Sequence, residues 1–305
     1  SDKDWPFSIF IKGGKILLSW EQFLCKANLS FKKPRGHYLR RNTFHLTWYE
    51  GYKKYISKYV NKKNIIDIND PNIDALNYEL NKRTLTTKFL TSYKLDPNKK
   101  LLLFSLNFNW AFITSKSIQA RIKRGYNPVQ AHEYNNYSKK SLCSFLVELN
   151  NSINLLSENF NVIIRTHPGI KEHQYINFAK TISIDLKKMD IRFINDKNVF
   201  TWVSHSDIVI SNWSTSAYHS RKCGKQSFLY QPFKSPDFLY PEWYKEVPKI
   251  KSFLKINNKK SKKELIINNK YDYGQKLFLE AINKMHHKLS SNKFQTIRLH
   301  TWKEI

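Results

Sequence analysis

The chain has 305 residues, of which 41% are hydrophobic, so it is long enough for one large or two medium globular domains. It contains no run of 18 uninterrupted apolar residues and only three widely separated cysteines, which argues against a membrane-spanning helix, a Cys-x-x-Cys metal site and a disulfide framework. The formal net charge of +28, from 52 Lys and Arg against 24 Asp and Glu, creates a field that attracts phosphates and anionic membranes.

Short strands are expected in the first 95 residues, with helical residues around Tyr49–Tyr59 between them. These strands are Phe7–Ile11, Lys15–Trp20, Phe44–Tyr49 and Asn64–Ile68. We interpret residues 1–95 as an N-terminal Rossmann-like domain. Because this length is small for a complete doubly wound domain, we expect the domain to be incomplete, with part of it preceding Ser1.

The pattern becomes regular after the polar segment Thr91–Lys100, which we interpret as an interdomain linker. Strands of buried type are predicted at Leu101–Leu106, Asn161–Arg165, Ile191–Ile194, Asp207–Ser211 and Ser227–Tyr230. Helices are predicted at Ser138–Asn159, Lys171–Lys188, Val199–Ser204, Thr215–Cys223 and Asp272–Lys288. This alternation predicts a doubly wound parallel sheet in a second domain, residues 96–285, followed by a tail or helix at 286–305.

Polar residues follow three of the predicted strands, and the carboxyl ends of parallel strands meet at the edge where such sheets bind ligands. Asn107 and Asn109 follow the first strand, and Arg165, His167 and Pro168 end the second. The third group, Ser211, Asn212, Ser214, Thr215 and Ser216, ends a strand and opens a helix. We therefore expect one nucleotide-binding or substrate-binding site formed by these ten residues.

The segment Ser214–Ser216 would place hydroxyls and free backbone N–H groups at a helix N-terminus, where an anion is stabilised. The alternative is an ordinary helix cap. His167 is held at the strand end by Pro168 and can donate to a phosphate, although a lone histidine is also compatible with a structural role. Together, the two segments favour phosphate binding over either alternative.

No pair of aspartates follows a strand in the way that a metal-dependent Asp-x-Asp transferase requires, so we expect no metal site and no cofactor. A metal-free enzyme needs cations to stabilise a departing nucleotide, and Arg165, Lys222 and Lys225 are the candidates.

Several of these segments resemble the bacterial surface carbohydrate biosynthesis proteins, a family related to the retaining β-Kdo glycosyltransferases. Leu103–Ala111 is similar to the family's strand followed by Asn-Phe-x-x-Ala, and Arg165–Pro168 is similar to its Arg-x-His-Pro. Ser206–Ser216 is similar to its Ser-Asp-x-x-Ile-x-Asn before a hydroxyl-rich helix start. Asn69–Asp74 matches a Gly-Asn-Pro-Arg-x-Asp-like element only weakly.

The resemblance covers roughly residues 13–230 and implies an α/β, GT-B-like fold with two Rossmann-like domains, the donor in the second and the acceptor in the first. It implies a metal-independent glycosyltransferase of capsule or lipopolysaccharide biosynthesis that takes Kdo or a similar acid sugar from a CMP-activated donor. His167 would act in catalysis as well as in binding. The expected catalytic carboxylate is Glu133, in a loop at Ala120–Tyr137 that should overhang the site, although a surface carboxylate is the alternative.

Other functions remain open. The His-Pro and Ser/Thr segments also occur in glycerophosphate polymerases and other CMP- or CDP-using transferases, so a glycerophosphate or sialic acid transferase is the nearest alternative. A family aspartate without a clear match here favours a non-catalytic glycan-binding or nucleic-acid-binding relative. The basic residues are spread along the chain, and no recognition helix, zinc knuckle or RNA-binding aromatic motif is present, so we expect no sequence-specific nucleic acid partner. Expected partners are a nucleotide-sugar donor, a glycan or glycolipid acceptor and an anionic membrane surface bound by the basic segment Lys249–Lys270, at the cytoplasmic face of the inner membrane.

Overall fold

The structure is a computed structural model that describes residues 70–256 apart from 84, 124–125, 197 and 240–242, with five strands and short pieces at 53–54, 57–58 and 61–62 outside that range. Its contacts divide the chain into two compact units, Ser1–Asp74 with Asn269–Ile305, and Ala75–Asn268. The predicted helices Tyr49–Tyr59 and Asp272–Lys288 lie mostly or wholly outside the described residues. The tail 286–305 does so too, apart from Ile297–Arg298.

The first unit contains a five-stranded sheet with the strand order β11-β1-β2-β3-β4. Its strands are β1 (Phe7–Ile11), β2 (Gly14–Trp20), β3 (Thr43–Thr47), β4 (Ile65–Asp67) and β11 (Ile297–Arg298). The run from β2 to β4 is parallel, as predicted, but β1 pairs antiparallel with β2 and β11, so this sheet is mixed. The reason is the connection: Ile11 pairs with Gly14, and two intervening residues allow a hairpin but not the long crossover that parallel strands need.

The second unit contains a six-stranded, all-parallel sheet with the order β10-β9-β8-β5-β6-β7. Its strands are β5 (Lys100–Ser105), β6 (Phe160–Arg165), β7 (Arg192–Ile194), β8 (Ile208–Ser211), β9 (Gln226–Tyr230) and β10 (Lys249–Ile250). This is the doubly wound order, because the chain moves from β5 to one side through β6 and β7, then returns to β8 and moves to the other side. The predicted parallel sheet is confirmed here.

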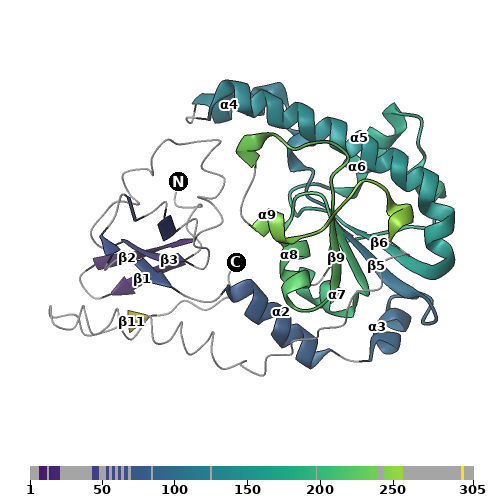
Figure 1. Cartoon of the computed structure of the whole chain (residues 1–305), viewed down its shortest axis with the longest axis horizontal. Helices are drawn as coiled ribbons and strands as arrows, with labels where there is room; N and C mark the ends of the chain where they lie inside the picture. The colour runs from purple at the N-terminus through teal and green to yellow at the C-terminus, as the bar shows by residue number, and fades with distance from the viewer. Residues whose placement is uncertain are drawn as a thin grey trace. The chain divides into compact units, whose positions relative to one another are not determined.

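Helices cover both faces of this sheet (Figure 1). The α-helices are α2 (Pro71–Lys82), α3 (Thr86–Ser92), α4 (Ser115–Lys123), α5 (Pro128–Asn159), α6 (Glu172–Thr181), α7 (Val199–His205), α8 (Thr215–Lys222) and α9 (Trp243–Glu246). Short 3-10 turns are η6 (Asn109–Phe112), η7 (Leu186–Lys188), η8 (Asp237–Leu239) and η9 (Phe253–Lys255). Within the described part of the chain, no helix is both long and apolar enough to cross a bilayer.

Strand β5 shows how the two faces differ. Alternate side chains point to opposite faces, so Leu102 and Phe104 belong to the main core with α5, where the rings of Phe104 and Phe145 lie 5.3 Å apart. Ser105, the residue after Phe104, faces α8, and its hydroxyl lies 2.9 Å from that of Ser216. The sheet therefore presents an apolar face to α5 and α6 and ends in hydroxyl groups on the α7 and α8 face.

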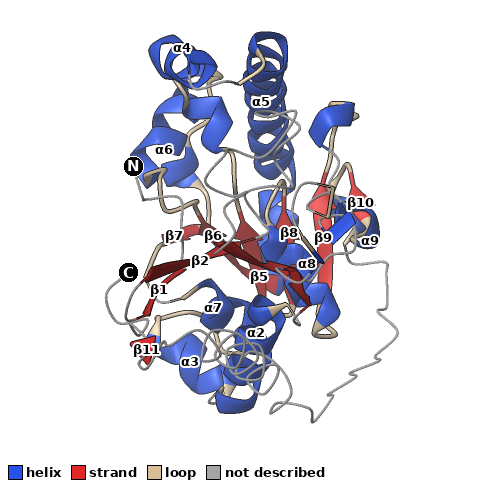
Figure 2. Cartoon of the chain, turned by 90° about the vertical axis from the view of Figure 1, so that its left-hand side faces the viewer, coloured by secondary structure: helices blue, strands red, loops and turns tan. Residues whose placement is uncertain are grey.

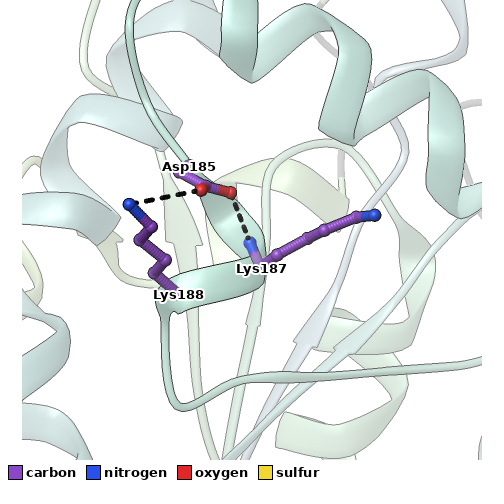
Figure 3. Close-up of polar contacts among 3 residues, drawn as sticks. All are labelled: Asp185, Lys187 and Lys188. Atoms are coloured by element: carbon purple, nitrogen blue, oxygen red, sulfur yellow. Dashed lines mark hydrogen bonds and ion pairs between the residues drawn. The ribbon is translucent and has the colours of Figure 1, made fainter.

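The helix predicted at Lys171–Lys188 is interrupted. Helix α6 ends at Thr181, because the backbone of Ser183 takes a left-handed conformation with φ of 60°. The chain then forms η7, whose N-cap Asp185 accepts a hydrogen bond from Lys187 N at 3.1 Å and lies 3.9 Å from Lys188 Nζ (Figure 3). A polar side chain thus closes the new turn.

Residues 75–95 pack with the second unit, whereas the sequence assigned them to the N-terminal domain. The ring of Phe89 in α3 stacks on His205 of α7 at 3.9 Å, and its edge meets Trp202 at 4.9 Å. These aromatic contacts belong to one core, which explains why the compact unit begins at Ala75 rather than after the polar linker.

Candidate functional site

The carboxyl ends of β5 and β8 meet at the topological switch point of the six-stranded sheet. The strands are neighbours, with Phe104 opposite Ile210, while the chain leaves them toward opposite sides of the sheet. Open α/β sheets bind their ligands in the crevice at such a point. All three predicted polar segments lie on this edge, because each directly follows the carboxyl end of β5, β6 or β8.

Asn107 and Asn212 join the ends of β5 and β8. Asn212 Oδ1 accepts a hydrogen bond from Asn107 N at 2.7 Å, and Asn212 Nδ2 donates to Asn107 O at 3.1 Å. Asn107 Nδ2 in turn donates to Trp213 O at 2.8 Å. The Oδ1 atom of Asn107 is buried and receives no hydrogen bond from the described residues. A buried acceptor without a donor is unusual in a folded protein, so the junction of β5 and β8 is a place of incomplete hydrogen bonding.

Helix α8 begins at this edge with three hydroxyl residues. Ser214 is the N-cap and accepts a hydrogen bond from Ser216 N at 3.3 Å. The hydroxyl of Ser216 is buried and lies 2.9 Å from that of Ser105 and 3.0 Å from that of Ser214. Thr215 is half-buried in the first turn, and Ser211 is fully buried with no described partner for its Oγ. Ser214 therefore caps the helix, and Ser216 holds the cap against β5.

The end of β6 forms a tight turn that carries His167. Its Nδ1 accepts a hydrogen bond from Gly169 N at 3.1 Å, so the neutral ring carries its proton on Nε2. Thr166 is buried beneath it and donates to Ile170 O at 2.8 Å. His167 is half-buried, while Pro168 is exposed beside it. The turn thus presents an imidazole with a defined donor atom at the predicted edge.

Arg165 lies one strand away from the hydroxyl cluster but is used within the protein. It donates to Asp196 O at 2.7 Å. Burial lowers the pKa of Arg165, and the nearby Asp196 carboxylate opposes that shift. A guanidinium keeps its charge in such a place, so Arg165 contributes positive potential at the end of β6.

The two predicted lysines are not at this edge. Lys222 lies at the far end of α8 and pairs with Glu246 at 2.5 Å. Lys225 precedes β9 and donates to Ser204 O at 2.7 Å and to Ser206 O at 2.8 Å, near the amino end of β8. Because α8 runs back from the carboxyl edge toward the amino edge, residues at its C-terminus cannot reach a ligand at its N-terminus.

The prediction of a loop at Ala120–Tyr137 is wrong, because the end of α4 and the first ten residues of α5 lie in that segment. Asn127 caps α5 by accepting from Gln130 N at 3.1 Å, and Pro128 follows at the first helical position. A 32-residue helix is about 48 Å long, more than twice a six-residue strand, and Figure 2 shows α5 reaching well beyond the sheet with α4 beside it. The overhanging element that was expected is therefore a helix.

Four aromatic residues connect this helix to the strand ends, and their role was missed in the sequence. The ring of Tyr134 in α5 lies 4.7 Å from Trp110 after β5 and 6.5 Å from Trp213 after β8. Trp213 also packs on Tyr244 at 4.7 Å. Asn135 donates to Trp110 O, and Asn109, which begins η6, is half-buried beside it. The usable signal was the tryptophan that follows the polar residue after two of the strands, Trp110 after Asn109 and Trp213 after Asn212.

Glu133 is exposed on α5 and lines a cavity of about 730 Å³ between this helix and the segment after β9. Tyr137, Lys140 and Asp237 line the same cavity. Among the described residues, no group of three or more His, Cys, Asp or Glu side chains is arranged to hold a metal ion. The catalytic role of Glu133 and metal-free chemistry both stay predictions.

No family model matches the chain, and no curated protein matches its sequence. A variant of the wall teichoic acid polymerase TagF aligns with a TM-score of 0.50 and 13% identity, covering 85% of this chain and 65% of that chain. The S. aureus MnaA–UDP co-structure aligns with a TM-score of 0.47 and 12% identity over 81% of this chain and 61% of that one. UDP-GlcNAc 2-epimerase from Neisseria meningitidis, bound to UDP-GlcNAc, aligns with a TM-score of 0.42 and 15% identity, covering 80% of this chain and 60% of that chain.

The chain thus spans less than two thirds of the length of each of these solved chains. At these identities the likeness concerns the fold alone. It supports the predicted α/β architecture of the GT-B type.

Proposed function

We propose that the protein is a glycosyltransferase of bacterial surface polysaccharide biosynthesis, acting in capsule or lipopolysaccharide assembly. The donor is a CMP-activated sugar, Kdo or a similar acid sugar. One observation carries the proposal: His167, the start of α8 and the Asn107–Asn212 pair follow three strands that end at one edge, at the switch point of a doubly wound sheet. The motif resemblance of the same segments supports CMP over other nucleotides.

In this proposal the donor phosphate lies at the N-terminus of α8, where the helix dipole and the backbone of Thr215 stabilise negative charge. His167 donates a hydrogen bond to the phosphate through Nε2 and stabilises the negative charge that develops on the leaving nucleotide. Asn107 holds the ends of β5 and β8 together beside the ligand through its hydrogen bonds with Asn212 and Trp213. Arg165 adds positive potential, and no metal or cofactor takes part.

The carboxylate that acts on the sugar is Glu133, which lines an open cavity on the helix that overhangs the sheet edge. Retaining transfer needs a nucleophile or a same-face mechanism, and inverting transfer needs a base; a carboxylate can serve as either nucleophile or base. The acceptor, a glycan or glycolipid, is assigned to the N-terminal domain by the family resemblance.

A glycerophosphate or sialic acid transferase is the nearest alternative, because the His-Pro and hydroxyl-rich segments also occur in glycerophosphate polymerases and other CMP- or CDP-using transferases. A non-catalytic relative is the other alternative. It is favoured by one specific observation: Glu133 is exposed on α5, as an ordinary surface carboxylate would be.

The test is release of CMP from CMP-Kdo in the presence of a Kdo-terminated oligosaccharide, followed by chromatography of the product. The wild type should release CMP and extend the acceptor, and Glu133→Gln should reduce turnover at least about a hundredfold. Glu158→Gln, an exposed glutamate at the other end of the same helix, should behave as wild type. Binding of CMP without turnover in any variant, wild type included, would favour the non-catalytic relative.

A further inference from the structure

The cavity beside α5 has a lining that the nucleotide site does not explain. It is formed by one face of the N-terminal half of α5 and by the segment that follows β9. The residues that matter are Glu133, Asn136, Tyr137, Lys140, Ser235 and Asp237. All belong to the second unit, so the cavity is a feature of the unit that carries the six-stranded sheet.

The groups that line the cavity disfavour a phosphate and favour a ligand with many hydroxyl groups. Two carboxylates, Glu133 and Asp237, disfavour a phosphate group, although Lys140 and Lys234 prevent a net negative field. Asn136 supplies both a donor and an acceptor, and Tyr137 supplies an aromatic face with a hydroxyl group. A lining that mixes carboxylate, amide, hydroxyl and ammonium groups around a ring matches a ligand with many hydroxyl groups.

The walls of the cavity are held by specific contacts. Lys140 Nζ lies 4.4 Å from the centre of the Phe233 ring, which directs its charged end along the segment after β9. Ser235 is buried and accepts a hydrogen bond from Gln231 Nε2 at 3.3 Å, while Lys234 pairs with Asp237 at 3.3 Å. The buried Ser235 therefore fixes the segment after β9 at the cavity, whereas Lys234 and Asp237 are exposed at its rim.

The cavity is also connected to the candidate nucleotide site. Tyr137 is close enough to Ser141 and Tyr244 to interact with both: burial raises the pKa of Tyr137, and these two neighbours oppose that shift. The ring of Tyr244 packs on Trp213 at 4.7 Å, and Trp213 lies between Asn212 and the helix cap Ser214. Tyr244, beside Tyr137 of the cavity lining, is thus in ring contact with the residue that precedes the N-cap of α8.

We propose that this cavity binds a saccharide unit, with Glu133, Asn136 and Asp237 hydrogen-bonded to its hydroxyl groups and Lys140 to an acidic substituent. The assignment deepens the proposed function, on which it rests for the link to transfer, by placing the sugar on α5 and the segment after β9. The unit can be the sugar of the donor or a residue of the acceptor polymer. Both present the same hydroxyl-rich chemistry to the cavity.

The test is saturation-transfer difference NMR with free Kdo, N-acetylneuraminic acid, N-acetylglucosamine and galactose, with glycerol 3-phosphate as the non-saccharide control. At least one sugar should show transfer with the wild type, and Asn136→Ala and Asp237→Asn should each weaken its binding about tenfold. Asn151→Ala, an exposed asparagine farther along α5, is the matched control and should leave binding unchanged. Binding that is equal in all variants, or absent for every sugar, overturns the proposal.

Two further measurements distinguish a failure of the saccharide cavity from a failure of the nucleotide site. CMP binding by the wild type is measured by calorimetry in the same buffer. Sugar binding without CMP binding supports the saccharide cavity and contradicts the nucleotide site. CMP binding without sugar binding supports the nucleotide site and contradicts the saccharide cavity. Titration of Asn136→Ala with CMP-Kdo and with a Kdo oligosaccharide then identifies the source. A tenfold loss for the first assigns the cavity to the donor sugar, and a tenfold loss for the second assigns it to the acceptor.

Discussion

His167 is the residue at which geometry and proposed chemistry meet most closely. Its Nδ1 accepts from Gly169 N at 3.1 Å, which directs the ring proton of the neutral form to Nε2. If Nε2 donates to a charged phosphate, His167→Ala should weaken CMP binding by about 1.5–3 kcal/mol, the range for a hydrogen bond to a charged group. The fold should survive, because the side chain is half-buried at a strand end rather than in the core.

Calorimetry with CMP measures this effect. His173→Ala is the matched control, since His173 is an exposed histidine on α6 and should not change the affinity. Unchanged CMP affinity in His167→Ala would mean that the imidazole only supports the turn at the end of β6.

At the same scale, the sequence identified the polar residues of the strand ends well and the flanking charges poorly. Asn107, His167 and Ser214 were found because each directly follows a buried apolar run, and that pattern places a residue at the carboxyl edge. Lys225 was misplaced because closeness in sequence to Ser216 does not mean closeness in space when a helix of eight residues separates them. The partner of Asn107, Asn212, lies 105 positions away, and no local pattern encodes such a bond.

The C-terminus of α7 shows how an element uses a buried cation. Lys225 donates to Ser204 O and Ser206 O, and Arg83 donates to Ser204 O at 2.9 Å, so two cations satisfy the last carbonyl groups of α7. Burial lowers the pKa of Lys225 to about 8, with the positive charge of Arg83 adding to the shift and Asp207 opposing it. The folded protein therefore binds this proton less tightly than the unfolded chain does.

The sign of the pH dependence follows from that difference. Between about pH 8 and the ordinary lysine value near 10.4, the unfolded chain holds the Lys225 proton and the folded protein has lost it, so stability rises with pH. Relative to Lys225→Met, the wild type should gain about 1–2 kcal/mol in free energy of unfolding from pH 8 to 9.5. Urea denaturation at four pH values measures this gain. Tyr93 and Tyr230, whose pKa values burial raises to about 12, affect both proteins alike. A difference that stays flat with pH would show that the lysine keeps its ordinary pKa.

The boundaries of an element were predictable from the sequence where a single pattern of residues marked them. The buried strands of the second sheet were placed within a residue or two, because a run of apolar residues between polar turns has few other interpretations. The start of α5 was missed, although Asn127 and Pro128 form a cap signal, because the following residues are polar and hide the helical period. Strand β10 has only two residues, too few to show any period.

For the whole molecule, the second sheet was predictable from alternation alone, whereas the mixed sheet of the first unit depends on the short connection between Ile11 and Gly14 and on β11 from the far end of the chain. Pairing between segments so distant in sequence cannot be derived from local patterns. The limits of the compact units depend likewise on long-range packing, as the stacking of Phe89 on His205 shows.

The net charge of +28 is a property of the whole chain, and we expect it to hold the protein reversibly at an anionic membrane surface. The densest basic cluster, Lys259, Lys260, Lys262 and Lys263, lies outside the described residues. Each lysine near such a surface contributes roughly 1 kcal/mol, so replacing all four by glutamine should weaken the binding strongly. Binding should also fall with salt, since the screening length is about 8 Å at physiological ionic strength.

Flotation with phosphatidylglycerol vesicles at physiological salt measures this association, with phosphatidylcholine vesicles as the lipid control. A variant with Lys82, Lys123, Lys139 and Lys188 changed to glutamine is the protein control. Sequence-selective binding of DNA or RNA at that salt, together with no vesicle association, would contradict this account of the charge.

The central claim is that the carboxyl edge formed by β5, β6 and β8 binds a cytidine nucleotide. The most direct measurement is a thermal-shift series with CMP, CDP, UDP and GDP, because a ligand that binds only the folded protein raises its melting temperature. We predict the largest rise with CMP, smaller rises with UDP and GDP, and loss of the CMP effect in His167→Ala. Stabilisation by GDP alone, or a CMP effect that is unchanged in His167→Ala, would contradict the claim.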